Sequence, residues 1–177
     1  MLGCSAADPH TLEGTIELAA AAIDRGDAGA LYARLDRRAR AAMSSIAHDR
    51  TAAARMIRAD YPEPERSVAL AALGDTLDAA DPAVLFERRC NAACMARLGD
   101  ALGAPRQTRK DGKELLVTTS RGGELRFFRG RDGLMGLVWR TQELAQERTR
   151  ANRELAQVVE NARIYRRRRE LETGERR

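Results

Sequence analysis

Glycine-containing turns divide the later part of the chain into short segments of strand length. The turns are Asp111-Gly112, Arg121-Gly122-Gly123 and Gly130-Arg131-Asp132-Gly133. The segments between and after them are Glu114–Thr119, Glu124–Arg129 and Leu134–Trp139, and a further short strand is expected near Gln107. Because short strands joined by tight turns pair in antiparallel fashion, the sequence predicts a meander of three to four strands.

Before these turns the apolar residues follow helical spacing. They recur every three or four positions in the ranges Leu12–Ile23, Leu31–Ile46 and Ala53–Ile57. Gly26 ends the first run, and Asp49 is of a residue type that caps helices. We therefore predict three successive helices, with Asp49 as the N-cap of the third.

A further helix is expected after Asp81-Pro82, since an acidic cap followed by proline is a typical helix start. This helix would place Phe86, Cys90, Cys94 and Leu98 four residues apart on one stripe, and Gly103 would end it. Large apolar residues are few, with aromatics at only 4%. We predict a core in which Phe127 or Phe128, Leu137 and Trp139 pack the sheet against the helix holding Phe86 and Leu98.

The order of these elements indicates an α+β fold, with N-terminal helices packed on a C-terminal meander and a long helix after it. Residues 1–10 are interpreted as a linker with a lipobox-like cysteine. Residues 11–140 form the globular domain in this interpretation, and residues 141–177 form a basic helix and tail. No apolar run approaches the roughly 20 residues that a membrane-spanning helix needs.

One segment resembles a known superfamily. Ala20-Ala21-Ala22-Ile23-Asp24-Arg25-Gly26-Asp27-Ala28-Gly29-Ala30-Leu31-Tyr32 is similar to the first helix and corner of NTF2-like domains. In that superfamily helices pack on a curved sheet to form a cone with a pocket, and many bacterial lipoproteins carry such a domain. The resemblance implies a helix-on-sheet fold, but no particular reaction, because the superfamily contains enzymes and non-enzymes.

The start of the chain resembles the lipobox of bacterial lipoproteins. Met1-Leu2-Gly3-Cys4-Ser5-Ala6-Ala7 has an apolar residue, a small residue, the cysteine and a short small-residue stretch. In that family the cysteine is lipidated after the signal peptide is removed, so the resemblance implies lipidation of Cys4. A signal peptide needs a basic segment and an apolar core. Location in the bacterial envelope is therefore expected if the true start lies upstream, and a cytoplasmic location otherwise.

Cys90 and Cys94 are the one pair of residues whose side chains could form a covalent bond or bind a metal. A zinc site needs four ligands, and no histidine lies near them in sequence. An intact helix would hold their Cβ atoms about 5–6 Å apart, farther than the roughly 3.5–4.5 Å of a disulfide. Either both are small buried core residues, or a disulfide bends or ends this helix, as export would allow.

Catalytic and metal sites are not indicated by the sequence. His10 and His48 are the only histidines, and a helix would direct His48 and Asp49 about 100° apart. There is no nucleophile elbow, phosphate-binding glycine loop or H-E-x-x-H motif. We expect no enzyme activity, no catalytic residue, no metal and no cofactor.

The last part of the chain contains no helix breaker from Thr141 to about Leu171. Leu144, Ala151, Val158 and Tyr165 repeat every seven residues, with Leu155 and Ala162 between them. The cluster Arg166, Arg167, Arg168 and Arg169 follows this apolar stripe. It is either a solvated helix end, where cations oppose the helix dipole, or a surface for anions. We predict an interaction surface made of Leu144, Leu155, Val158, Tyr165 and the four arginines.

Net charge and arginine content leave two interpretations of the basic character. The net charge is +5, and Lys110 and Lys113 are the only lysines. The guanidinium group of arginine suits phosphate binding, but a GC-rich genome also raises the arginine content of a protein.

We expect a non-enzymatic, lipoprotein-like binding domain of the envelope. It would bind a protein partner or a second copy of itself through the terminal helix, and an anionic membrane surface is a further possible partner. The alternatives are a cytoplasmic nucleic-acid-binding protein that uses the arginine cluster, which the lack of aromatic interleaving disfavours, and an NTF2-like pocket enzyme.

Overall fold

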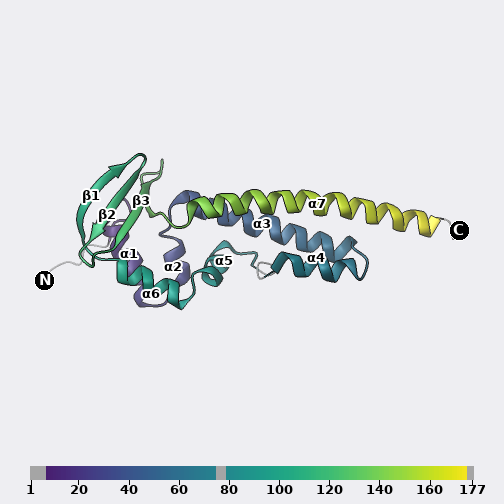
Figure 1. Ribbon diagram of the computed structural model, residues 1–177, viewed down its shortest axis with the longest axis horizontal. Coiled ribbons are helices and arrows are strands. Elements are labelled where there is room, and N and C mark those ends of the chain that lie inside the picture. The colour runs from purple at the N-terminus through teal and green to yellow at the C-terminus, as the bar shows by residue number, and fades with distance from the viewer. Residues whose placement is uncertain (1–6, 75–78, 175–177) are drawn as a thin grey trace. The chain divides into compact units, whose positions relative to one another are not determined.

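The computed structural model describes residues 7–74 and 79–174. Its contacts divide the chain into two compact units. Unit 1 comprises the described residues up to Ala41 together with Phe86–Gln142, and unit 2 comprises the described residues of Ala42–Leu85 and those from Glu143 onward. Helices precede a four-stranded antiparallel sheet, and a long helix ends the chain, so the predicted α+β fold is confirmed (Figure 1).

Unit 1 contains the sheet and the helices next to it. Its complete elements are α1 (Leu12–Asp24), α2 (Ala28–Tyr32), α6 (Ala92–Ala101), β1 (Pro105–Asp111), β2 (Glu114–Thr119), β3 (Glu124–Arg129) and β4 (Met135–Leu137). Side chains that accept hydrogen bonds start the helices: Thr11 accepts from Gly14 N, Asp27 from Ala30 N and Asn91 from Cys94 N. α1 packs beside β4 and α6.

The sheet is a simple meander with the strand order β1-β2-β3-β4. Asp111 pairs with Glu114, which leaves a two-residue turn at Gly112 and Lys113. Gly112 has a φ of 61°, a conformation that residues with a Cβ rarely adopt. β2 and β3 have the bounds expected from the sequence, and the strand expected near Gln107 is β1.

The core of unit 1 contains most of the residues predicted for it, but Leu98 is half-buried and lies on α6, a different helix from that of Phe86. Phe86, Phe127, Leu137 and Trp139 are all buried, and Phe127 rather than Phe128 points inward. The rings of Phe86 and Trp139 meet edge to face, with centroids 5.0 Å apart. Because strand side chains alternate between faces, only one of the two adjacent phenylalanines can enter the core.

β4 holds the loop before α3 (Arg37–Asp60) against the sheet. The Asp36 N–H donates to the Leu137 carbonyl at 2.8 Å, and the Leu137 N–H donates to the Arg34 carbonyl at 2.9 Å. A Cβ added to Gly136 would lie 2.4 Å from Asp36 Cα, closer than real Cβ contacts allow. Glycine at this position therefore permits the contact that places the start of α3.

Three helix predictions are wrong. The helix expected over Leu31–Ile46 is interrupted, because α2 ends at Tyr32 and α3 begins at Arg37. α3 runs without interruption from Arg37 to Asp60, so Asp49 lies inside a helix instead of capping one. Ile46, Ala53 and Ile57 are buried along this one helix, and their packing favours continuity over a break at Asp49. The single helix expected after Asp81-Pro82 is two helices, α5 (Pro82–Arg89) and α6, separated at Cys90 and Asn91.

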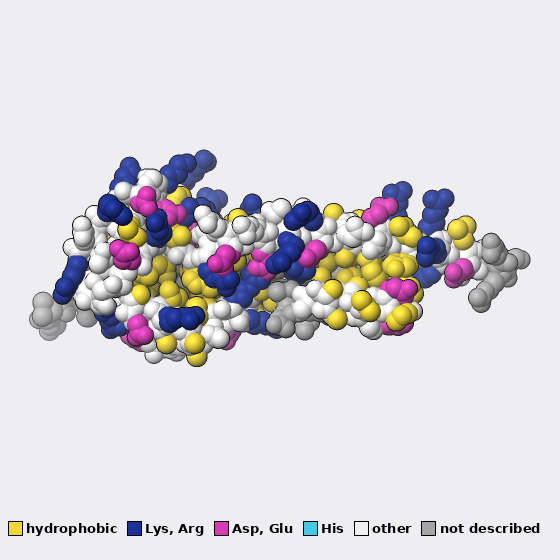
Figure 2. Space-filling model, viewed as in Figure 1, with side chains coloured by type: hydrophobic (Ala, Val, Ile, Leu, Met, Phe, Trp, Pro, Cys, Tyr) yellow, Lys and Arg dark blue, Asp and Glu magenta, His cyan; other side chains and the backbone are white. Residues whose placement is uncertain are grey.

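Unit 2 is built from α3 from Ala42 onward, α4 (Glu65–Leu73), the start of α5 and most of α7 (Thr141–Gly174). One core cluster joins α3, α4 and α7: Ala53, Ala54, Ile57, Tyr61, Leu73, Val158 and Ala162. Partly buried hydrophobic side chains border it, and Figure 2 shows hydrophobic groups along the seam between α4 and α7. The apolar stripe of α7 therefore has packing partners within its own unit.

Candidate anion-binding pocket

A cavity of about 210 Å³ lies in unit 1 between the loop before α3 and the turn from β3 to β4. Its polar side chains are Arg34, Arg37, Arg40 and Asp132. The remaining walls are small or apolar, and they include Leu35, Leu134 and Gly136. We call this cavity the basic pocket. The contact of β4 with the Leu35–Asp36 backbone fixes one of its walls.

Three of the four polar side chains in the basic pocket are cations. In the part of the chain that the structure describes, no ion pair or side-chain hydrogen bond involves the guanidinium groups of Arg34, Arg37 and Arg40. The Nε atom of Arg40 is buried and has no acceptor. Asp132 Oδ1, in contrast, accepts from the Leu134 N–H at 3.3 Å and so helps to form the turn. The formal charge of this lining is 3 − 1 = +2.

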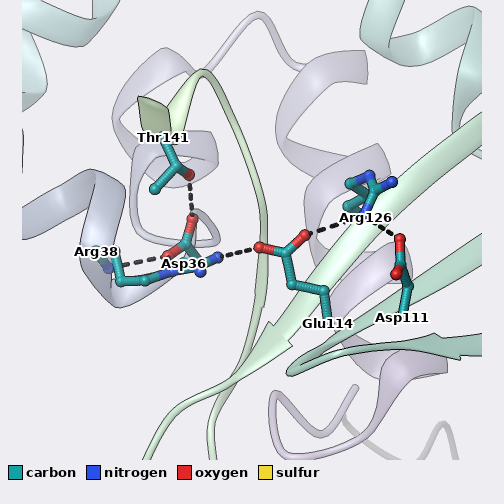
Figure 3. A network of polar contacts seen from close by, with 6 residues as sticks. All are labelled: Asp36, Arg38, Asp111, Glu114, Arg126 and Thr141. Carbon is teal, nitrogen blue, oxygen red and sulfur yellow. Dashed lines mark hydrogen bonds and ion pairs between the residues drawn. The ribbon is translucent and has the colours of Figure 1, made fainter. Parts of the chain in front are cut away.

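A polar network holds the start of α3 to β2 (Figure 3). Arg38 lies between two carboxylates, with Nε 2.8 Å from Asp36 Oδ1 and a terminal nitrogen 2.8 Å from Glu114 Oε1. Asp36 also accepts from the Thr141 hydroxyl at 3.3 Å and from the Arg38 N–H at 2.9 Å. Figure 3 shows these groups pointing toward one another from the loop before α3, the start of α3, β2 and the start of α7. The network fixes the backbone that carries Arg37 and Arg40.

The electrostatics of this network favour charged Arg38. Burial opposes the charge of its guanidinium, but hydrogen bonds and attraction from Asp36 and Glu114 outweigh burial and raise the pKa of Arg38 above its ordinary value. Arg38 also lies over the Phe128 ring, 4.2 Å from its centroid. Arg126 extends the network by pairing with Asp111 at 2.7 Å and with Glu114 at 3.3 Å. Arg38 and Arg126 therefore both have carboxylate partners, whereas the arginines of the basic pocket have none in the described chain.

The cysteines predicted as a pair are joined by a disulfide. Cys90 is buried and Cys94 is half-buried, and the bond spans the break between α5 and α6. An unbroken helix would keep these two side chains too far apart, so the helix break and the bond belong together. Cys4, the expected lipidation site, lies outside the described residues.

The predicted interaction residues of the terminal helix fall into two groups, apolar side chains that are buried or half-buried and arginines that are exposed. Leu144 and Val158 are buried, and Leu155 and Tyr165 are half-buried, the last three against the core cluster of unit 2. Arg166, Arg167, Arg168 and Arg169 are exposed, and Asp60 pairs with Arg166 at 3.4 Å and with Arg169 at 3.0 Å. The predicted role of this helix in binding a partner stays a prediction.

His48 and Asp49 lie on the same open hollow of about 630 Å³ in unit 2, together with Ser44, Ser45 and Arg148. His48 is exposed and Asp49 is buried. His10 is exposed in unit 1. Among the described residues, no group of three or more His, Cys, Asp or Glu side chains is arranged to hold a metal ion.

Sequence reasoning missed the basic pocket. The available signal was the three-residue spacing of Arg34, Arg37 and Arg40, which stands out only once the chain is known to turn at Leu35. No helix in the described part of the chain is long and apolar enough to span a bilayer. Comparison with protein-family models, with curated proteins and with solved structures produced no match to this chain.

Proposed function

We propose that this protein is a non-enzymatic binding domain of the bacterial envelope, anchored by lipid on Cys4. The observation that carries the proposal is the disulfide between Cys90 and Cys94. Protein disulfides form and persist in oxidising compartments such as the bacterial periplasm, and they are rare in the cytosol. The lipobox-like start and the resemblance to NTF2-like domains support the same location, because many lipoproteins carry such domains.

The chemistry of the basic pocket supports binding over catalysis. A guanidinium group stays protonated at physiological pH, so Arg34, Arg37 and Arg40 attract charge without exchanging protons. Asp132 accepts a hydrogen bond from the backbone of its own turn. This lining suits recognition of an anion. We therefore expect the native protein to show no hydrolase, transferase or isomerase activity that depends on His48. A reaction that the native protein catalyses and a folded His48→Ala variant does not would overturn the non-enzymatic proposal.

Nucleic-acid binding through the arginine cluster is the alternative. Arg167 and Arg168 are exposed at the end of α7. Asp60 engages Arg166 and Arg169, which reduces the charge that the cluster offers to a phosphate backbone. The envelope proposal is therefore better supported, with self-association or a protein partner at the exposed parts of α7 as its proposed mode of interaction.

Export and lipidation can be tested together in a bacterial host. The full upstream reading frame is expressed, and a labelled fatty acid is followed onto the protein and onto a Cys4→Ser variant. We expect label on the native protein alone.

The disulfide is tested by thiol alkylation in intact cells. Neither Cys90 nor Cys94 should react with the alkylating reagent, and the Cys90→Ser variant is the control, because it leaves Cys94 as a free thiol. Unlabelled protein in which both Cys90 and Cys94 react with the alkylating reagent would assign it to the cytoplasm.

A further inference from the structure

We propose that the basic pocket is a binding site for a phosphate-type oxyanion, held by Arg34, Arg37 and Arg40. The proposal goes beyond the envelope assignment and does not depend on where the protein resides. It rests on a cavity whose cations have no partners in the described chain, beside a network in which Arg38 and Arg126 are fully paired.

Charge is the first argument. Arg38 at the start of α3 pairs with Asp36 and Glu114, and Arg126 on β3 pairs with Asp111 and Glu114. The three pocket arginines instead share a small cavity with one carboxylate, Asp132, which already accepts from the Leu134 N–H. Like charges brought together in a partly enclosed space repel one another, so an anion entering the pocket is attracted by all three.

Arg40 provides the second argument. Its side chain is half-buried in the pocket wall, and its Nε is enclosed without an acceptor. Buried donors nearly always have a hydrogen-bond partner, so an unpartnered guanidinium at a cavity indicates a missing acceptor. An oxyanion that accepts from Nε and a terminal nitrogen of Arg40 would supply this acceptor and compensate a charge that nothing in the described chain compensates.

The size of the pocket and the number of donors select the anion. The cavity of about 210 Å³ is below the roughly 300–1,000 Å³ of sites for drug-sized ligands, so it suits one compact group. A phosphate offers more acceptor oxygens than a carboxylate and carries up to two negative charges, which matches three guanidinium groups better. The phosphate could belong to a soluble ester or to a lipid headgroup, and the chemistry of recognition is the same.

The test uses the purified full-length chain and titration calorimetry with inorganic phosphate at low salt, with acetate as the second anion. We expect phosphate to bind at one site and acetate to bind at least about tenfold more weakly. Arg37→Gln and Arg40→Gln should each raise the phosphate Kd about tenfold or more, the factor expected when a charged hydrogen bond is lost. Arg106→Gln removes the same charge from an exposed position on β1 and should change the Kd less than about twofold.

Arg34→Gln serves as a second pocket variant if Arg40→Gln does not fold, as judged by circular dichroism. Equal Kd values for the pocket variants and Arg106→Gln would overturn the proposal, as would equal binding of acetate and phosphate. Vesicles of phosphatidylcholine, with and without phosphatidylglycerol, identify the source of the phosphate. Arg37-dependent binding to the anionic vesicles supports a lipid headgroup, and phosphate binding without vesicle binding supports a soluble ester. The absence of any phosphate or vesicle binding rejects the site, whatever the outcome of the lipidation experiment.

Discussion

Arg38 and Asp36 form an ion pair in which the two partners differ sharply in exposure. The distance from Arg38 Nε to Asp36 Oδ1 is 2.8 Å, with 38% of the arginine side chain exposed and 0% of the aspartate side chain. The arginine reaches solvent through its outer side while it neutralises a buried carboxylate. Asp36 lies next to Leu137 of β4 through its backbone, so the pair connects the start of α3 to the sheet.

The first prediction concerns this pair. Arg38→Met keeps most of the apolar stem but removes the guanidinium, which pairs with Asp36 and lies over the Phe128 ring. Asp36 then stays buried without a cation, and we expect a loss of about 3 kcal/mol in the free energy of unfolding. Arg126→Met is the matched control, because Arg126 also pairs with Glu114 but is exposed, and its loss should be much smaller. Urea denaturation followed by Trp139 fluorescence measures both; equal losses would contradict this account.

The second prediction concerns the core of unit 1. Phe86 is 0% exposed and lies edge to face with Trp139. Phe86→Ala should lower the free energy of unfolding by about 3–5 kcal/mol, since it removes a buried ring and leaves a cavity. Phe86→Leu retains much of the volume and should cost clearly less. Urea titration monitored by circular dichroism gives both values, and a loss under about 1 kcal/mol for Phe86→Ala would show that the core is assigned wrongly.

The third prediction separates a packed terminal helix from a free one. Val158 is 8% exposed and its neighbour Val159 is 42% exposed. Val158→Ala should cost about 2 kcal/mol of stability, whereas Val159→Ala should stay within about 0.5 kcal/mol. Truncation after Arg150 removes Val158 and Ala162 from the core cluster, and unit 2 should then lose cooperative unfolding. Equal small effects of the two valine variants would indicate that α7 does not depend on this packing.

The fourth prediction is a loss of stability at alkaline pH through Tyr61. Burial raises the pKa of Tyr61 above its ordinary value of 10.0, and repulsion from Tyr165 adds to this, while a hydrogen bond with Asn161 opposes it. Between the unfolded and the folded pKa, the native state retains a proton that the unfolded state has lost. The contribution of Tyr61 is therefore intact below about pH 10 and is lost as the pH rises through its higher folded pKa. Denaturation curves from pH 9 to 11, in steps of about 0.5, should show a steeper decline for the native protein than for Tyr61→Phe, and parallel curves would contradict the assignment.

The fifth prediction concerns the disulfide. Cys90 and Cys94 are 4 residues apart, and a loop this short is expected to contribute about 2 kcal/mol to stability. Addition of a reductant should lower the free energy of unfolding by about this amount. A Cys90→Ala/Cys94→Ala double variant provides the control, since its denaturation curve should not respond to the reductant. If the native protein is equally insensitive, the bond does not support the junction between α5 and α6.

Local sequence patterns determined the meander. The bounds of β2 and β3 follow from alternation between glycine turns, and Gly112 occupies the positive-φ position that its hairpin requires. The start of α5 at Pro82 was predictable for the same reason, with Asp81 accepting a hydrogen bond from the Ala83 N–H. Turn and cap preferences act over two to four residues, so the sequence contains all the information that they use.

Only the tertiary structure decided whether α3 continues past Asp49 and where the basic pocket forms. An aspartate can cap a helix or lie within one, and burial of Ile46 and Ile57 on the same side settles the choice. Arg37 and Asp132 line the same pocket because Gly136 lets β4 approach the Asp36 backbone. These residues are about a hundred positions apart in the chain, and their proximity depends on steric fit and burial between segments, which no local preference encodes.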